Sequence, residues 1–312
     1  MPSPESAAAG PIERLKPFLA LSRTPHGLLD MAMPIAAALL WLGSFPPAPV
    51  ALLGLLTVFA GYTAVYALND LADYGTDRAN FLEGQGDNSG YLDAVYARHP
   101  LAMGLLTKRQ AYAWAGGWAL TALLGAYLLS PVCAYILLAG CVMEVAYCLL
   151  LKVSHLRALI NGVVKSLGGV AAMLAVDPAA PLWFPALLFG VTFLWEIGGQ
   201  NIPADWFDLE LDRRQGARTM CVALGLERAA RVSLWTLTGA TALAFFLLAL
   251  SPAGLPWWLV LAATAAIAWL LPLSALKLGR SPSRESASAL FARASYLPVV
   301  LLGTTLFWFA FR

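Results

Sequence analysis

Charged residues are scarce in this chain. Asp, Glu, Lys and Arg make up only 12% of its 312 residues, whereas 60% are hydrophobic and the mean hydropathy is +0.70. A soluble globular domain has about 25% charged residues, so the composition excludes that class and indicates an all-α polytopic membrane protein. The formal net charge of +2 identifies no partner by itself. We expect the lipid bilayer as a partner, and no nucleic acid.

Cysteine is also rare, and no pair has the CxxC spacing of a metal or redox site. Four cysteines lie in or beside apolar runs: Cys133, Cys141, Cys148 and Cys221. This placement favours buried small side chains over disulfides or metal ligands. The N-terminus lacks a basic segment before a short apolar core, so residues 1–13 are interpreted as a flexible cytosolic tail. Residues 14–312 are expected to form a single membrane-embedded domain.

Nine apolar stretches are long enough to span a bilayer, which takes about 20 residues. The expected helices are 27–43, 50–69, 111–130, 132–151, 158–176, 183–201, 230–250, 255–274 and 290–310. Alternate connections lack Lys and Arg, and the others, together with the first residues of the spans that follow them, contain every basic residue except Lys165 and Arg312. Because positive charge stays on the cytosolic side, the N-terminus is predicted inside and the C-terminus outside. We expect a nine-helix bundle in the bacterial inner membrane, around a cavity open to the cytosol.

An Asp-x-x-Asp-x-x-x-Asp pattern occurs twice, each time after an apolar run and before arginine. The two copies are Asp70, Asp73 and Asp77, preceded by Asn69, and Asp205, Asp208 and Asp212. On a helix, positions i, i+3 and i+7 share one face, so each copy is expected to present a stripe of three carboxylates. Carboxylates at the ends of membrane helices are costly unless a cation holds them. The repeat therefore predicts divalent metal on the cytosolic side.

Aspartates at this spacing suit Mg²⁺, which takes oxygen ligands and completes its shell with substrate phosphates. Two facing stripes would hold a diphosphate through bridging Mg²⁺ ions. The ions would neutralise the charge that develops when the diphosphate leaves. The apolar helices would then surround whatever group the diphosphate carries.

Four segments together carry a resemblance to a known family. They are residues 69–77, residues 205–219 with Gly216 and Thr219, the Arg98–Thr107 segment, and Tyr147 with Leu151 and Lys152. In this order they resemble the first and second signatures, the R-P-L segment and the Tyr…Leu-Lys end of span four in the UbiA superfamily of intramembrane prenyltransferases. The similarity covers about residues 15–310. Met103, where that family has a small hydroxyl residue, and a longer segment 79–97 depart from it and leave the acceptor open.

The resemblance implies Mg²⁺-dependent transfer of an isoprenoid group from a polyprenyl diphosphate donor to a lipophilic or aromatic acceptor. It implies that metal and diphosphate are bound by Asn69, Asp70, Asp73, Asp77, Asp205, Asp208 and Asp212. We expect catalytic roles for two of these residues, Asp73 and Asp208, and also for Lys152 and Glu144. Substrate-binding roles are expected for Arg23, Asn69, Arg78, Tyr147, Lys165, Gln200, Asn201 and Arg213. The segment 79–97 is either a lid over the site or a tolerated insertion.

Ionisable side chains within the expected spans are a second signal of function. Lys165 is expected either to contact the diphosphate or to pair with a structural acid. Glu144 and Glu196 are expected to orient the acceptor, to take a proton from it, or to make a structural hydrogen bond. The three histidines, His26, His99 and His155, are interpreted as forming no metal-ligand set.

Three functional alternatives stay open at this point. A UbiA-type terpene cyclase would quench the allylic cation internally. A cation transporter would use the same acids as ion ligands, although such sites usually lie near the bilayer midplane. A silent family member would bind lipid without turnover. Acceptor, donor chain length and oligomeric state are not readable from the sequence.

Overall fold

The computed structural model describes residues 10–82, 96–97 and 99–312, and all regular structure in these ranges is helical. Helix α1 begins at Pro11, so the end of the expected 1–13 tail is helical, and residues 1–9 lie outside the described part. The elements are α1 (Pro11–Leu21), α2 (Thr24–Asp30), α3 (Ala32–Leu42), α4 (Ala48–Ala72), α5 (Tyr74–Leu82), α6 (Lys108–Leu129), α7 (Pro131–Leu149), α8 (Arg157–Val176), α9 (Trp183–Trp195), the π-helical turn η3 (Glu196–Asn201), α10 (Ile202–Phe207), α11 (Leu209–Gln215), α12 (Met220–Leu224), α13 (Leu226–Ala249), α14 (Trp257–Leu270), α15 (Pro272–Arg280), α16 (Arg284–Ala294) and α17 (Leu297–Phe311).

Eight helical segments in the described part are long and apolar enough to cross a membrane. Three of them join consecutive elements: α2 with α3, α14 with α15, and α16 with α17. Large apolar side chains on α7, such as Val142 and Leu149, are exposed, as expected where lipid covers them. The expected span 183–201 corresponds to α9 followed by η3, and α9 alone is too short to count. The count of nine is therefore not confirmed, whereas the all-helical membrane architecture is.

The chain divides into two compact units. The first consists of residues 1–28 and 56–125, and the second of residues 29–55 and 126–312. In the first unit, α1, the second half of α4 and α6 meet in a small core. This core contains Leu21, Ala67, Leu101, Leu106, Ala111 and Ala115, with Phe18, Leu71 and Trp114 packed against it.

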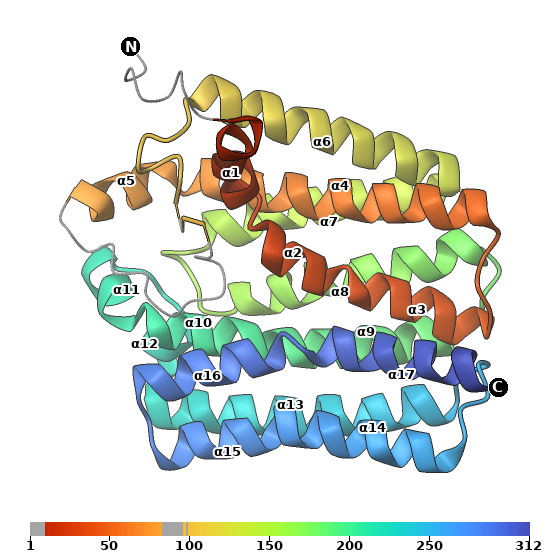
Figure 1. Cartoon of the computed structure of the whole chain (residues 1–312). Coiled ribbons are helices and arrows are strands. Elements are labelled where there is room, and N and C mark those ends of the chain that lie inside the picture. Colours follow the sequence, from red (N-terminus) through yellow and green to blue (C-terminus); the bar gives the residue numbers. More distant parts are fainter. Residues whose placement is uncertain (1–9, 83–95, 98) are drawn as a thin grey trace. The chain divides into compact units, whose positions relative to one another are not determined.

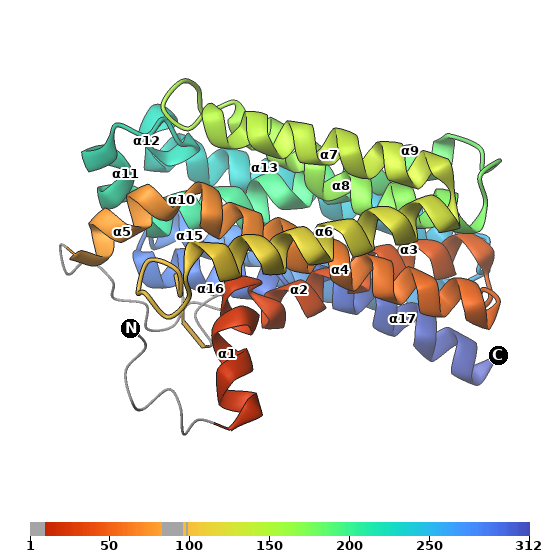
Figure 2. The same cartoon turned by 90° about the horizontal axis from the view of Figure 1, so that it is seen from above.

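The second unit has a larger core that is built around α8 and α13. Helix α8 packs against α3, α7 and α9, while α13 packs against α9, α14 and α15 (Figures 1 and 2). Its largest fully buried side chains include Trp195, Phe184 and Met173. Small residues allow these close contacts: a Cβ at Gly162 of α8 would lie 2.9 Å from the Phe193 ring of α9.

The turn η3 interrupts the helix that leads to the second Asp motif. The hydroxyl of Ser233 in α13 donates a 2.7 Å hydrogen bond to the carbonyl oxygen of Gly198. A Cβ added at Gly198 would collide with the Thr236 hydroxyl, and one at Gly199 would lie 2.8 Å from the Ala294 Cβ. Two consecutive glycines thus let α13 and α16 press against this turn and hold it in place.

Candidate metal and substrate site

Both Asp motifs interrupt their helix at the second aspartate. Helix α4 ends at Ala72 and α5 begins at Tyr74, so Asp73 lies in the break. Helix α10 ends at Phe207 and α11 begins at Leu209, so Asp208 occupies the corresponding position. The expectation of a stripe on one continuous helix is therefore wrong in both copies. Helical i to i−4 hydrogen bonds still bridge each break, from the second Asp N–H to the carbonyl four residues earlier and from the third Asp N–H to the second Asp carbonyl.

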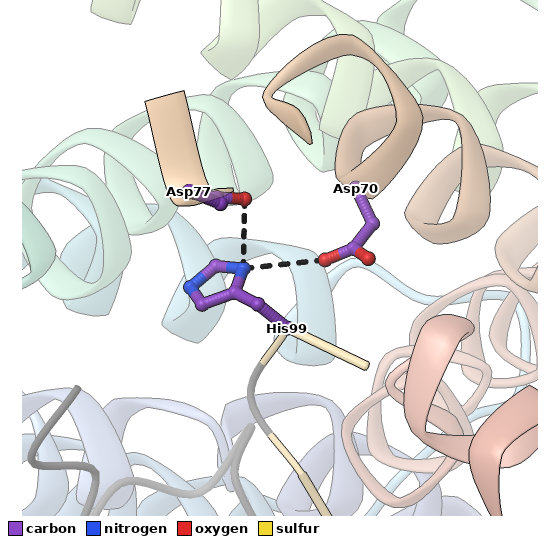
Figure 3. Close-up of side chains that lie close together, drawn as sticks. All are labelled: Asp70, Asp77 and His99. Carbon is purple, nitrogen blue, oxygen red and sulfur yellow. Dashed lines mark hydrogen bonds and ion pairs between the residues drawn. The ribbon is translucent and has the colours of Figure 1, made fainter. Parts of the chain in front are cut away.

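The first motif brings its first and third aspartates together around an imidazole. His99 Nδ1 lies 3.2 Å from Asp70 Oδ1 and 2.8 Å from Asp77 Oδ2 (Figure 3). Ligand atoms of the three residues all lie within 4.8 Å of one another, close enough to hold one metal ion. The interpretation that His26, His99 and His155 form no metal-ligand set did not anticipate this candidate group, which contains His99. Asp73 is exposed and lies outside this trio.

The electrostatics of this trio favour a cation. Burial alone would lower the pKa of His99, but the contacts with Asp70 and Asp77 outweigh it and raise the pKa above the usual 6.5. Asp70 is 3% exposed, and among the described residues its Oδ2 has no hydrogen-bond partner. A buried carboxylate oxygen without a donor is costly, and coordination to Mg²⁺ would satisfy it. The two carboxylates, which offer oxygen ligands, fit this ion.

The cationic residues expected near the first motif belong to the same unit. Arg23 joins α1 to α2 and has φ +43°, a left-handed conformation that is unusual for a residue with a side chain. Its guanidinium lies 5.7 Å from the centre of the Tyr66 ring, and its charge lowers the pKa of His99, which places it near the trio. Arg78 donates a short hydrogen bond to the carbonyl oxygen of Ala102. The left-handed backbone of Arg23 is strained, and strain of this kind often accompanies function.

The second motif also ties its first and third aspartates to one neighbouring segment. The backbone N–H of Met220, the first residue of α12, donates a 2.8 Å hydrogen bond to Asp205 Oδ2. The hydroxyl of Thr219 donates a 2.9 Å hydrogen bond to Asp212 Oδ2. Asp208 again is not part of this arrangement and is half-buried.

Negative charge accumulates in the second motif. Burial and the charge of Asp212 raise the pKa of Asp205 from the usual 3.8 to about 7. Burial and the charge of Asp208 raise the pKa of Asp212 to about 6, although the Thr219 hydrogen bond opposes this rise. Carboxylates crowded together in this way release their protons readily only when a cation compensates them. This set also fits Mg²⁺.

Other predicted substrate-binding residues of the second unit have protein partners. Lys165 Nζ lies 2.6 Å from Asp30 Oδ2, so the structure contains the structural acid that was the alternative to a diphosphate contact. The Arg157 guanidinium donates a 2.7 Å hydrogen bond to the Tyr147 hydroxyl and lies 4.0 Å from the centre of its ring. Lys152 is exposed in the turn that follows α7, and Glu144 is half-buried within that helix.

Three further predicted positions flank the second motif. Arg213 is exposed and lies 3.2 Å from Glu210, one turn earlier on α11. Gln200 Nε2 donates a 3.3 Å hydrogen bond to the Ser295 hydroxyl. Asn201 Nδ2 donates a 2.9 Å hydrogen bond to Glu196 Oε1. The predicted lid, 79–97, lies largely outside the described residues, which exclude 83–95.

Sequence reasoning missed His99, Arg157 and Asn161. His99 follows the first motif by more than twenty residues, and no local pattern shows that the chain returns there. Arg157 and Asn161 lie four residues apart on α8, which is one helical turn, and Lys165 is the next such position. That i, i+4, i+8 spacing of polar residues in an apolar helix was the available signal.

Comparison with known proteins agrees with this architecture. A profile of the UbiA prenyltransferase family matches residues 31–310. A digeranylgeranylglyceryl phosphate synthase of Thermococcus sibiricus is 26% identical over 273 residues, which are 88% of this chain and 90% of the relative. The apo structure of a UbiA homologue from Aeropyrum pernix has a TM-score of 0.73 at 21% identity and covers 90% of this chain and 97% of that one. A UbiA homologue from Archaeoglobus fulgidus bound to DMAPP and Mg²⁺ has a TM-score of 0.64 at 17% identity, covering 95% and 99%.

Proposed function

The chain belongs to the UbiA prenyltransferase family, and we propose that it transfers an isoprenoid group from a polyprenyl diphosphate to a lipophilic or aromatic acceptor with Mg²⁺ as cofactor. It is an integral membrane prenyltransferase. One observation carries the proposal: in each Asp motif, the first and third carboxylates are drawn together by a neighbouring segment and surrounded by features that favour a cation.

In this proposal both motifs contribute ligands to Mg²⁺ and the donor diphosphate. The metal, when bound, stabilises the negative charge on the departing diphosphate. Asp70, Asp77, Asp205 and Asp212 would hold the ions, and Asp73 and Asp208 would supply further carboxylate oxygens. The proposed cationic contacts to phosphate oxygens come from Arg23, Arg78, Lys152, Lys165 and Arg213.

The relatives narrow the substrates that deserve testing. The Archaeoglobus homologue was solved with DMAPP and Mg²⁺ and also with GPP and Mg²⁺. The Thermococcus relative is named for a product that carries two geranylgeranyl groups on glyceryl phosphate. These names support an allylic diphosphate donor and make a glycerol-type hydroxyl a first acceptor to test, beside quinone-precursor rings. We place the motifs on the cytosolic side, with the N-terminus inside, from the distribution of Lys and Arg.

The direct test is diphosphate release by the purified full-length protein in lipid nanodiscs. Labelled geranyl and geranylgeranyl diphosphates are incubated with Mg²⁺, with and without an acceptor, and both diphosphate and organic products are measured. We expect Mg²⁺-dependent release and a prenylated acceptor, and we expect Asp73→Ala and Asp208→Ala to lose both. Asp177→Asn is the matched control, because Asp177 lies at the far end of α8 and accepts a hydrogen bond from Trp41.

Each alternative predicts a different result. Release with a cyclised hydrocarbon and no acceptor product would identify a terpene cyclase. Donor binding without release would identify a silent family member. Mg²⁺ flux across sealed proteoliposomes, without turnover, would identify a transporter. If both motifs serve one diphosphate, single and double Asp variants should be strongly non-additive, as for other groups that act as a unit.

A further inference from the structure

A buried carboxylate lies on the turn that precedes the second Asp motif. Glu196 is 2% exposed, and its Oε1 accepts hydrogen bonds from Asn161 Nδ2 of α8, at 3.0 Å, and from Asn201 Nδ2, at 2.9 Å. Asn161 Nδ2 also lies 3.2 Å from Asn201 Oδ1. These three residues form a hydrogen-bonded polar group in the interior of the helices, and we call them the Glu196 cluster.

The surroundings of the Glu196 cluster indicate a functional role beyond packing. A carboxylate is expensive to keep in the apolar interior of a membrane protein, and such residues are usually functional. The π-helical turn that carries Glu196 is a rare conformation that is often found at functional sites. Neighbouring helices fix this turn through the Ser233 hydrogen bond to Gly198 and through Trp195 Nε1, which donates a 2.8 Å hydrogen bond to the Ala294 carbonyl.

The position of the cluster relates it to the chemistry of the second motif. Asn201 precedes Asp205 by four residues on a continuous run of helical backbone, which corresponds to one turn and about 6 Å along the helix. Asn201 therefore lies one turn before the first carboxylate proposed to hold Mg²⁺ and diphosphate, and it links Glu196, earlier on the same run of helix, to that motif. The reacting carbon of a polyprenyl diphosphate is bonded directly to a diphosphate oxygen, so an acceptor must approach within a few ångströms of that group.

We propose that the Glu196 cluster binds the acceptor and that this acceptor carries a hydroxyl group, as an alcohol or a phenol. In the transfer step, the bond between the allylic carbon and the diphosphate oxygen breaks, and its electron pair leaves with the diphosphate. The hydroxyl oxygen forms the new bond to that carbon, and its proton passes to the Glu196 carboxylate. Asn161 and Asn201 hold the carboxylate in place and orient the hydroxyl. This inference rests on the proposed prenyl transfer.

The experiment separates donor activation from transfer. Wild-type protein, Glu196→Gln, Glu196→Asp and Asn161→Leu are assayed in nanodiscs with geranylgeranyl diphosphate and Mg²⁺. Diphosphate release is measured without acceptor. Transfer is measured to glyceryl phosphate that carries one geranylgeranyl chain, and to 4-hydroxybenzoate as a phenol. Thr192→Val is the matched control, because Thr192 is buried one turn earlier on α9 and its hydroxyl bonds only to the carbonyl of Leu188 among the hydrogen bonds of the described residues.

For Glu196→Gln we expect at least a 100-fold lower kcat for transfer, an acceptor KM within about 3-fold of wild type, and acceptor-independent diphosphate release within about 3-fold. Glu196→Asp keeps a carboxylate and should restore part of the lost kcat. Asn161→Leu should raise the acceptor KM by 10-fold or more. Thr192→Val should behave as wild type in every assay.

Two results would overturn the inference. In one, Glu196→Gln transfers at the wild-type rate to the accepted hydroxyl compound. In the other, it loses diphosphate release and transfer in equal proportion, and Glu196→Asp does the same, which would place Glu196 in the donor site or in the fold. A wild-type protein that releases no diphosphate at all would instead contradict the proposed function. Efficient transfer to a carboxylate acceptor alone would contradict the hydroxyl assignment.

Discussion

The two Asp motifs have the same spacing and the same backbone break, yet they are completed in different ways. In the first motif a histidine side chain joins Asp70 to Asp77. In the second, a hydroxyl and a backbone N–H from the start of α12 contact Asp212 and Asp205. An imidazole can carry a proton and can itself bind metal, whereas a hydroxyl and an amide supply only hydrogen bonds.

The shared spacing therefore supplies the same three aspartates in each motif, whereas the neighbouring segment sets the electrostatic environment of their carboxylates. The first motif has an internal group that can offset its negative charge. In the second, the positive charge of Arg157 lowers the pKa of Asp205 and Asp212, but burial and the neighbouring carboxylates outweigh it, and both pKa values are raised. We therefore expect the second motif to depend more strongly on the metal itself.

The most severe test removes the first carboxylate from each motif. Asp70→Asn and Asp205→Asn should each reduce Mg²⁺-dependent diphosphate release by about 100- to 1,000-fold, since each removes electrostatic stabilisation of the leaving group. Release is measured at saturating donor and several Mg²⁺ concentrations. A loss in only one variant would show that the two motifs are not equivalent in the reaction, contrary to the proposal.

A smaller effect is expected when His99 or Thr219, whose side chains contact the paired carboxylates, is changed. Outer contacts to metal ligands typically contribute about 10- to 100-fold in metal affinity or activity. His99→Gln should approach the upper value, because it removes a possible ligand and both carboxylate contacts. Thr219→Val removes one hydrogen bond and should stay near the lower value. Mg²⁺ titration of donor-dependent activity gives both numbers, and the reverse order would contradict the distinction between the motifs.

Arg23→Gly separates activity from stability in the first unit. The guanidinium proposed to contact phosphate is lost, so we expect activity to fall by about 10-fold or more. Glycine adopts φ +43° without strain, so thermal stability should stay within a few degrees of wild type. Arg23→Ala is the matched variant, which also loses the charge but keeps the strain. If Arg23→Gly is less stable than Arg23→Ala, the strain argument is wrong.

The pH dependence of Mg²⁺ binding should distinguish the motifs further. Asp205 and Asp212 have folded-state pKa values of about 7 and 6, above the unfolded value of about 3.9. Without metal, the associated stability is fully present below about pH 4 and is lost as the pH rises through 6 to 7. Mg²⁺ binds the ionised carboxylates, so the rise in melting temperature that it causes should grow between pH 5 and pH 8.

Two variants localise that pH effect. Asp205→Asn removes the carboxylate with the higher pKa, so most of the pH dependence between 6 and 7 should disappear. Asp177→Asn should leave the profile unchanged. A wild-type profile that is flat from pH 5 to pH 8 would contradict the raised pKa values.

The smallest change is expected at the exposed end of the second motif. Arg213 and Glu210 form an ion pair in which both side chains are more than half exposed. Surface pairs of this kind contribute about 0–1 kcal/mol. Glu210→Gln should therefore shift the melting temperature by no more than about a degree and leave activity unchanged. A large loss would show that this acid contributes to the site.

Much of this architecture was predictable from the sequence because it depends on local composition and spacing. Apolar length identified the all-helical membrane architecture, although not a confirmed count of nine spans, and the repeated aspartates identified the two acidic motifs and the family. The break at Asp73 and Asp208 was not predictable, because both stretches have ordinary helical periodicity. The His99 contact and the Lys165–Asp30 ion pair join segments that are distant in sequence, so only tertiary packing reveals them.

The π-helical turn η3 has a consequence for the direction in which the second motif faces. A π turn accommodates one residue more than an α turn, and each residue of an α-helix adds about 100° of rotation. If the same residues wound as a regular α-helix instead, the extra residue would rotate Asp205 and the residues after it by about 100° around the axis. Gly198 and Gly199, against which α13 and α16 pack, thus help to fix the direction in which the second Asp motif faces.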